Sequence, residues 1–141
     1  MIEDISRMPR YPSLEYLGGF FDGEGSIGIF SSSLCARVTN TDLHVLEAFL
    51  AEWGGSIVPH TAAGPKRKEC HQWKCYGQNA EDALTDLFPH LREKRMQAFM
   101  GIEYRRLLPK DPKRPWIERE ISTLKHLGRK KTTPWSLIGA L

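Results

Sequence analysis

The sequence predicts an α+β fold in which helices cover one face of an antiparallel sheet. Short runs with alternating apolar residues occur in two pairs, each with a turn or loop between its members, as in β-hairpins. Longer segments between and after them repeat apolar residues every three or four positions, as in amphipathic helices. Residues that cap or end helices stand at the borders. The predicted order is α-β-β-α-β-β-α, followed by C-terminal helices.

The first helix and the first hairpin follow each other directly. Ser13 is a favourable N-cap, and the helix is expected to run to about Glu24, where Gly25 ends it. Residues 26–40 then alternate over two short runs with serines between them, which predicts a β-hairpin.

The second half of the order repeats this arrangement. A helix is expected to start at Asp42, and the glycine pair after Trp53 stops it. Two strands, at 56–60 and 70–78, flank a loop that contains glycine and lysines. Asn79 is expected to cap the short helix that follows.

Prolines mark the remaining helices. Pro89 is expected to open a longer helix from about His90 to Leu108, which Pro109 ends. Pro115 is expected to start a final helix. We expect the 141 residues to form a single domain, because a chain of this length suits one core and hardly two. The expected core spans about 13–108 and the C-terminal helical extension about 115–141.

Composition is ordinary for a globular protein, with 40% hydrophobic and 26% charged residues. The N-terminus has no signal-like apolar run, and the apolar stretches are too short to cross a bilayer. Three cysteines, an odd number, suit a reducing compartment without structural disulfides. We therefore expect no membrane partner and no secretion. We also expect no organic cofactor. The expected location is the cytoplasm or nucleoid, or an organelle matrix if the gene is organellar.

The placement of charge says more than the net charge of +3, which is only mildly basic. Basic clusters at 64–69, 110–114 and 128–131 are flanked by loop formers and would attract phosphates, although solvated loops are as common for any one cluster. Period-two alternation also divides the sheet into two faces. The side chains expected to face the helices in the first hairpin are Ile27, Ile29, Leu34, Ala36 and Val38.

The opposite face, with Cys35 among its residues, is rich in side chains that donate hydrogen bonds to base edges and phosphates. An ordinary solvated sheet face is the alternative, but it would contain more aspartate and glutamate. The predicted DNA contacts on this face and its loops are Ser26, Gly28, Phe30, Ser32, Arg37, Thr39, His60, Lys66, Arg67, Lys68, Gln72, Lys74 and Tyr76.

The segment LGGFFDGEG, residues 17–25, resembles the nine-residue motif that names the LAGLIDADG homing endonucleases. Four positions are identical to the motif, and the others keep its size, polarity or charge. Residues 38–42 and 89–98 also resemble segments of that family, and the resemblance covers roughly residues 14–108. It implies that family's α-β-β-α-β-β-α fold with a saddle-shaped sheet. The identical positions are Leu17, Gly19, Asp22 and Gly25.

The glycines within the motif suggest that the first helix packs against another helix. Gly19 and Gly23 stand four residues apart on one helix face, and small residues in that spacing let two backbones approach closely. We find only one such motif in the chain, so the resemblance implies a homodimer with a two-fold axis between paired helices. The predicted interface residues are Leu17, Gly18, Gly19, Phe20 and Gly23.

The resemblance also assigns the candidate active site. Paired Glu24 carboxylates would hold Mg²⁺, with the Gly23 carbonyl as a possible further ligand, while Asp22 would be structural. Lys94 matches a lysine near the scissile phosphates, although a surface lysine is the alternative. Asn40 matches a polar position near the active-site waters, but it could instead only cap the next helix. The candidate catalytic residues are Glu24, Lys94 and Asn40, the candidate metal ligands are Glu24 and Gly23, and His44 could join the solvent pocket.

A zinc site is an alternative use of Cys70, His71, Cys75 and His60. On one strand, however, Cys70 and Cys75 fall on opposite faces, so they cannot easily share one ion. The spacing is also wrong for a zinc finger. We therefore do not favour zinc.

The function that the resemblance implies is a site-specific, Mg²⁺-dependent double-stranded DNA endonuclease. It would act as a homodimer on a long, pseudo-palindromic target and leave 3′ overhangs, as its relatives do. One alternative is a cleavage-inactive LAGLIDADG protein that binds DNA or RNA as a maturase or regulator. Another is a protein-interaction domain whose sheet binds a second chain.

Overall fold

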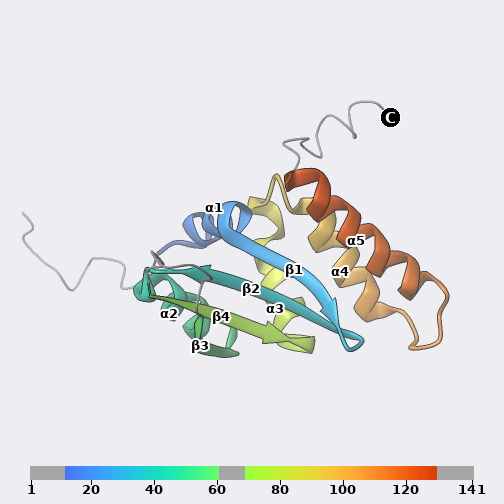
Figure 1. Ribbon diagram of the computed structural model, residues 1–141, viewed down its shortest axis with the longest axis horizontal. Helices are drawn as coiled ribbons and strands as arrows, with labels where there is room; N and C mark the ends of the chain where they lie inside the picture. The colour runs from blue at the N-terminus through green and yellow to red at the C-terminus, as the bar shows by residue number, and fades with distance from the viewer. Residues whose placement is uncertain (1–11, 61–68, 130–141) are drawn as a thin grey trace, which may run out of the picture.

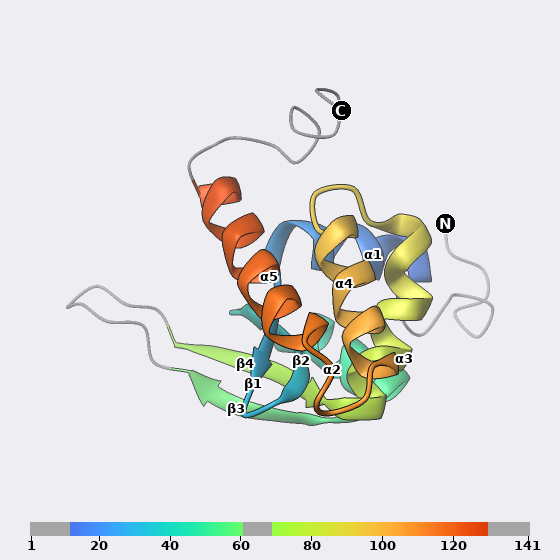
Figure 2. The ribbon, with the colours of Figure 1, turned by 90° about the vertical axis from the view of Figure 1, so that its right-hand side faces the viewer.

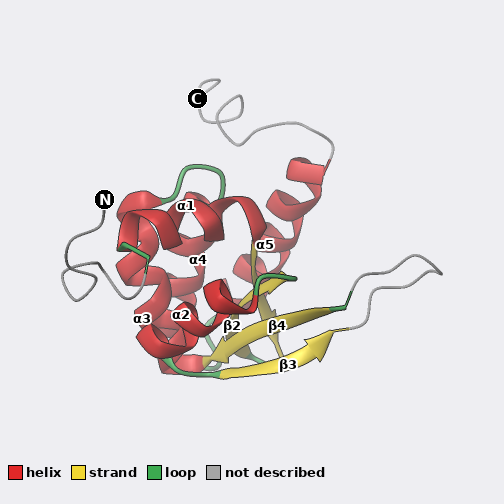
Figure 3. Ribbon diagram, turned by 90° about the vertical axis from the view of Figure 1, so that its left-hand side faces the viewer, coloured by secondary structure: helices red, strands yellow, loops and turns green. Residues whose placement is uncertain are grey.

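The computed structural model describes residues 12–60 and 69–129 (Figure 1). A four-stranded antiparallel sheet with the order β1-β2-β4-β3 carries helices on one face, which confirms the predicted α+β class (Figure 3). The predicted α-β-β-α-β-β-α order is confirmed as well. The elements are α1 (Leu14–Glu24), β1 (Gly25–Phe30), β2 (Ser33–Asn40), α2 (Leu43–Trp53), β3 (Ser56–His60), β4 (Cys70–Tyr76), α3 (Gly77–Leu87), the 3₁₀ turn η2 (Phe88–His90), α4 (Arg95–Arg106) and α5 (Lys113–Arg129).

Helix α1 passes into strand β1 without an intervening loop. The Ser13 side chain caps the helix by accepting the Tyr16 N–H at 3.1 Å, and the Gly25 N–H donates to the Phe21 carbonyl at the other end. Gly25 has extended backbone angles and is also the first residue of β1. Glu24 is therefore the last residue before the chain enters the sheet.

The core lies between the inner face of the sheet and helices α1 to α4. Aromatic rings fill its centre, where Phe49 and Trp73 lie 4.9 Å apart between ring centroids and Phe21 is fully buried. The Trp73 indole N–H donates to the Gly54 carbonyl at 2.8 Å. The predicted inward residues of the first hairpin are buried, except Ile29, which is half-buried.

Helix α3 begins earlier than predicted. It starts at Gly77 directly after β4, so Asn79 lies inside the helix and is not its N-cap. Gly77 has a φ of 60°, a left-handed value that glycine adopts without steric cost. This conformation turns the chain from strand to helix in one residue, and the cap expected at Asn79 is not used.

Helix α4 begins later than predicted, at Arg95 instead of His90. After η2, Leu91 takes extended backbone angles and its side chain is buried. The next backbone N–H groups, in residues 92–94, donate to the Asp22 side chain of α1. A distant carboxylate thus replaces the hydrogen bonds that a helix would have made there.

Helix α5 begins at Lys113, two residues before the expected start at Pro115. The Asp111 side chain accepts the Lys113 N–H at 2.8 Å and so caps the helix. Ile117 and Ile121 pack with Tyr104 of α4 in a second small core, and Figure 2 shows α5 running beside α4. The rest of the predicted extension, 130–141, lies outside the described residues. None of the described helices is long and apolar enough to span a membrane.

Gly18 of α1 packs closely against His90 of η2, and we expect its replacement to destabilise the fold. A methyl group at Gly18 would collide with the Cβ atom of His90. Gly18→Ala should lower the free energy of unfolding by about 1–3 kcal/mol, the range for overpacking a dense core. Urea denaturation at several protein concentrations measures this decrease. Because the clash lies within one chain, a decrease that appears only at low concentration would contradict the prediction.

Candidate active site and nucleic-acid interface

Glu24 places an exposed carboxylate at the C-terminal end of α1. The last turn of the helix contains no basic residue, and its unpaired carbonyl groups carry partial negative charge. The negative charge of the Glu24 carboxylate beside these carbonyl groups is unfavourable unless a cation binds there. The end of α1 is therefore an anionic position that favours a bound cation with oxygen ligands.

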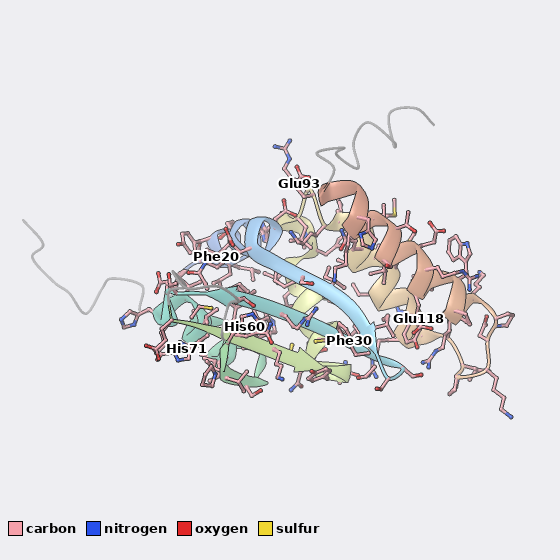
Figure 4. All side chains as sticks on the ribbon, in the orientation of Figure 1. Phe20, Phe30, His60, His71, Glu93 and Glu118 are labelled. Atoms are coloured by element: carbon pink, nitrogen blue, oxygen red, sulfur yellow. The ribbon has the colours of Figure 1, made fainter. Side chains whose placement is uncertain are left out.

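Asp22, two residues earlier, points into the chain. Its carboxylate accepts the N–H groups of Arg92, Glu93 and Lys94 at 3.1, 3.0 and 2.9 Å. We call this set of hydrogen bonds the Asp22 latch. Figure 4 shows Glu93 projecting outward from the latched segment. The latch ties the start of α4 to the end of α1, in agreement with the predicted structural role of Asp22.

Lys94 lies at the same end of α1. Its Nζ donates to the Asp22 backbone carbonyl, which closes a second link between the two segments. Burial lowers the pKa of the Lys94 ammonium, and the nearby carboxylates of Asp22, Glu93 and Glu24 partly oppose that effect. The Lys94 ammonium therefore lies at the end of α1 that carries Glu24.

Asn40 lies at the end of β2, near the junction of α1 and β1. The strand register pairs Gly25 with Val38, so β2 continues past the start of β1 to Asn40. Its Oδ1 accepts the Asp42 N–H at 2.9 Å. Asn40 therefore helps to fix the start of α2, which is the alternative role that the sequence leaves open. The His44 side chain is 96% exposed and lies 3.9 Å from Glu47, one turn further along α2.

One face of α1 combines exposed glycines with the exposed Tyr16 ring and the half-buried Phe20 ring. Tyr16, Gly19, Phe20 and Gly23 follow the spacing of one helix face, and the rings of Tyr16 and Phe20 stack with centroids 6.1 Å apart. A methyl group at either glycine would meet nothing within 4 Å. This four-residue set, the α1 face, leaves room for a second helix backbone.

Two of the predicted interface residues are not on the α1 face. Leu17 is a buried core residue, and Gly18 packs against His90. Their place in the motif reflects packing within the chain. Tyr16 lies on the exposed side of α1 instead, although it is not among the predicted interface residues. The signal was available, because Tyr16 stands three and four residues before Gly19 and Phe20.

The outer face of the sheet carries most of the predicted DNA contacts. Ser26, Arg37 and Lys74 pair across β1, β2 and β4 in one row, and Arg37 Nη2 lies 3.5 Å from the Ser26 hydroxyl. In the next row the Gln72 side-chain amide donates to the Thr39 hydroxyl at 3.0 Å. The exposed residues here and at the hairpin turn include Phe30, Ser32, His60 and Tyr76.

Two outward positions are covered. Gly28 is buried because the Phe30 ring folds back over it, and the Arg37 guanidinium stacks on that ring at 4.6 Å from its centroid. Cys35, opposite Gly28 in the register, is fully buried although it lies on the outer side. Gly28 therefore cannot contact DNA directly in this conformation. Lys66, Arg67 and Lys68 lie outside the described residues.

The residues considered for zinc are separated by the sheet. The Cys70 thiol donates to the His60 carbonyl at 3.0 Å at the end of the β3–β4 pair, whereas Cys75 is buried on the inner face. Burial raises the pKa of the Cys75 thiol to about 12. Within 12–60 and 69–129 no three His, Cys, Asp or Glu side chains gather to hold an ion. A metal at Glu24 would accordingly need ligands from water, backbone or a second chain.

Comparisons with known proteins identify the fold. No protein-family model matches the sequence, and no curated protein matches it. The solved structure of the homing endonuclease I-CvuI in complex with its target and Ca aligns with a TM-score of 0.61 and 19% identity, covering 79% of this chain and 80% of the other. I-CvuI with the I-CreI target and Mg, described as uncleaved, gives 0.59 and 18%, with coverage of 79% and 80%.

An archaeal intron-encoded endonuclease, I-Vdi141I complexed with DNA, aligns with a TM-score of 0.58 and 14% identity, covering 79% of this chain and 82% of the other. These proteins are LAGLIDADG homing endonucleases. At such identities the likeness establishes a shared fold. The structural resemblance that the nine-residue motif predicted is therefore confirmed.

Proposed function

We propose that this chain, which has the fold of LAGLIDADG homing endonucleases, is a site-specific endonuclease for double-stranded DNA. The observation that carries the proposal is the end of α1, where Glu24 is exposed and the Lys94 ammonium donates to the Asp22 carbonyl two residues before it, at the border of the polar outer face of the sheet. A carboxylate and an ammonium at the border of a DNA-sized surface suit phosphodiester hydrolysis.

A homodimer would complete this site. The α1 face offers two glycines without neighbours and a stacked aromatic pair, which would be buried if two copies of α1 packed around a two-fold axis. Such packing would bring two Glu24 carboxylates together at the helix ends. Within the described residues no second acidic side chain joins Glu24 in a cluster that could hold an ion, so the partner's Glu24 would supply the second carboxylate.

Mg²⁺ fits the donors present, because it prefers hard oxygen ligands and keeps several waters. Glu24 and the Gly23 carbonyl would hold it, and when bound it supplies an activated water and stabilises charge on the leaving oxygen. Lys94, fixed by the Asp22 latch, would offset negative charge on the phosphate. Asn40 would orient polar groups near the junction through its side-chain amide.

The outer sheet face would lie in the major groove on each side of the cleavage site. Arg37, Lys74 and Gln72 carry donors that suit base edges and phosphates, and the two-fold axis would extend the target into a long, pseudo-palindromic sequence. Because the Phe30 ring covers Gly28 and supports Arg37, apolar or shape readout at Phe30 would be coupled to Arg37.

The direct test is incubation of the full chain with a plasmid library that contains its own gene's flanking sequence, with and without Mg²⁺. Double-strand cuts at one site that require the ion support the proposal. DNA binding without cuts would favour the alternative, a cleavage-inactive maturase or regulator. No affinity for DNA at low salt would contradict both.

The α1 face yields a separate prediction. Gly19→Leu should weaken self-association strongly while the chain stays folded, because the added side chain occupies the space for the second helix and its Cβ meets no atom of its own chain within 4 Å. Analytical ultracentrifugation measures the change. Thr85→Leu, at an exposed position of α3, is the matched control and should leave association unchanged. An unaltered dimer in Gly19→Leu would place the interface elsewhere.

A further inference from the structure

A recess lies between strand β1 and helix α5, at the edge of the outer sheet face. Its cavity volume is about 220 Å³, and its walls include Gly28 and Phe30 from β1 and Ser122, Lys125 and His126 from α5. Figure 4 shows Phe30 and Glu118 close together at this border. None of the α5 residues entered the predicted DNA surface.

The α5 side of the recess is one stripe of the helix. Glu118, Ser122 and Lys125 stand at the i, i+4 and i+7 positions, and Ile121 between them is buried against the second core. The stripe is therefore fixed in rotation by Ile121. Its polar side chains line the recess together with residues of β1.

The charge of Lys125 reaches the outer face of the sheet. Burial raises the pKa of the Cys35 thiol, and the cations of Arg37, Lys74 and Lys125 lower it. Cys35 lies on the outer side of β2, directly opposite Gly28. Since Arg37 and Lys74 are outer-face residues, α5 adds a third cation to the same electrostatic region.

The width of the sheet, compared with that of the DNA major groove, indicates which part of the DNA would lie over this recess. Four strands at the usual spacing span about 14 Å from β1 to β3, whereas the major groove is about 12 Å wide. Because the sheet is wider than the groove, its edge strands would lie beside the sugar-phosphate backbones if its centre faced the groove. β1 is one of the two edge strands, and α5 lies beside it (Figure 1).

We propose that the recess between β1 and α5 binds a phosphate group of the DNA backbone, with Lys125 as its main cation. This inference rests on the proposed DNA binding and adds α5 to the surface as a clamp that does not read sequence. Ser122 and His126 supply further hydrogen-bond donors. Glu118 lies two helical turns from Lys125, about 10 Å along the axis, and opposes an anion at the other end of the stripe.

The salt dependence of DNA affinity tests this site. For the full chain, we compare the slope of log affinity against log salt between about 50 and 200 mM. In Lys125→Gln the slope should become less steep. Its magnitude should decrease by roughly 0.9 for each phosphate that is no longer neutralised, or about 1.8 per homodimer. Affinity should weaken equally on target and random duplexes. Glu118→Gln should instead strengthen binding to both.

Arg119→Gln is the matched control, because Arg119 is exposed on α5 and lies outside the stripe. An equal slope for Lys125→Gln and Arg119→Gln, or a weakening confined to the target sequence, would overturn the proposal. In that case wild-type binding and cleavage would leave the proposed function standing. Wild-type protein without DNA affinity would refute both together.

Discussion

Replacing Glu24 with glutamine is expected to reduce DNA cleavage by more than about a hundredfold and to leave DNA binding in place. The substitution removes the exposed acid at the end of α1 and keeps its size. Removal of groups that merely orient metal ligands costs about 10–100-fold, so removal of a ligand itself should cost more. Single-turnover cleavage with Mg²⁺ and a binding assay without it measure the two effects separately.

Mixing the two proteins tests whether the paired carboxylates act together. If an active dimer needs both Glu24 side chains, equal amounts of wild-type and variant chains should keep about a quarter of the double-strand cleavage after free exchange. If each chain acted alone, the mixture would keep about half of the wild-type cleavage. Glu15→Gln, an exposed acid in the first turn of the same helix, should have no effect. Full cleavage by Glu24→Gln would refute the proposed site.

Periodicity and caps were sufficient to predict the element order. Ser13, Gly25 and Asp42 mark ends that the structure confirms, because each acts through contacts within a few residues. Short-range chemistry of this kind can be read from one stretch of sequence. The hairpin turn is less obvious, since Ser31 and Ser32 take left-handed angles, with φ of 50° and 62°, that are uncommon for serine.

Errors arose where a distant residue decides the local structure. The helix expected from His90 begins at Arg95 because Asp22, some seventy residues earlier, takes the N–H groups that an earlier start would use. Helix propensity in that segment could not show this competition. The identity of the partner depends on the packing of α1 against η2.

The candidate site shows the same division between local and tertiary information. Motif similarity selected Glu24 and Lys94, and the structure places the Lys94 ammonium against the Asp22 carbonyl, two residues before Glu24. Motif similarity did not distinguish which motif residues face the chain's own core, and so it assigned Leu17 and Gly18 to the wrong side. Strand alternation likewise gave the correct direction for Gly28 but not the Phe30 ring that covers it.

The Asp22 latch connects the fold directly to the candidate site. Asp22 accepts backbone N–H groups from three consecutive residues, the last of which is Lys94. Lys94 in turn donates to the Asp22 carbonyl. Through this pair of links, the position of the ammonium relative to Glu24 depends on a side chain that need not touch DNA or metal.

Asp22→Ala should therefore reduce both stability and cleavage. The three charge-assisted hydrogen bonds suggest a decrease of roughly 2 kcal/mol in unfolding free energy, comparable to a strong helix cap. Displacement of Lys94 by about 1 Å is enough to reduce cleavage by about a hundredfold. Asp22→Asn keeps one acceptor oxygen and should recover part of both. Urea denaturation and single-turnover cleavage, with DNA affinity measured in parallel, give the three values.

Asp111→Ala separates positioning from stability. Asp111 caps α5 by accepting the Lys113 N–H, so its removal should also destabilise the chain, but it leaves the latch intact. At a temperature where both variants are folded, Asp111→Ala should cleave at the wild-type rate and Asp22→Ala should not. If cleavage falls equally in the two, or if folded Asp22→Ala cleaves normally, Lys94 does not depend on the latch for its place. Unchanged DNA affinity in Asp22→Ala would show that the defect falls on the chemical step, as a displaced ammonium at the scissile phosphate requires.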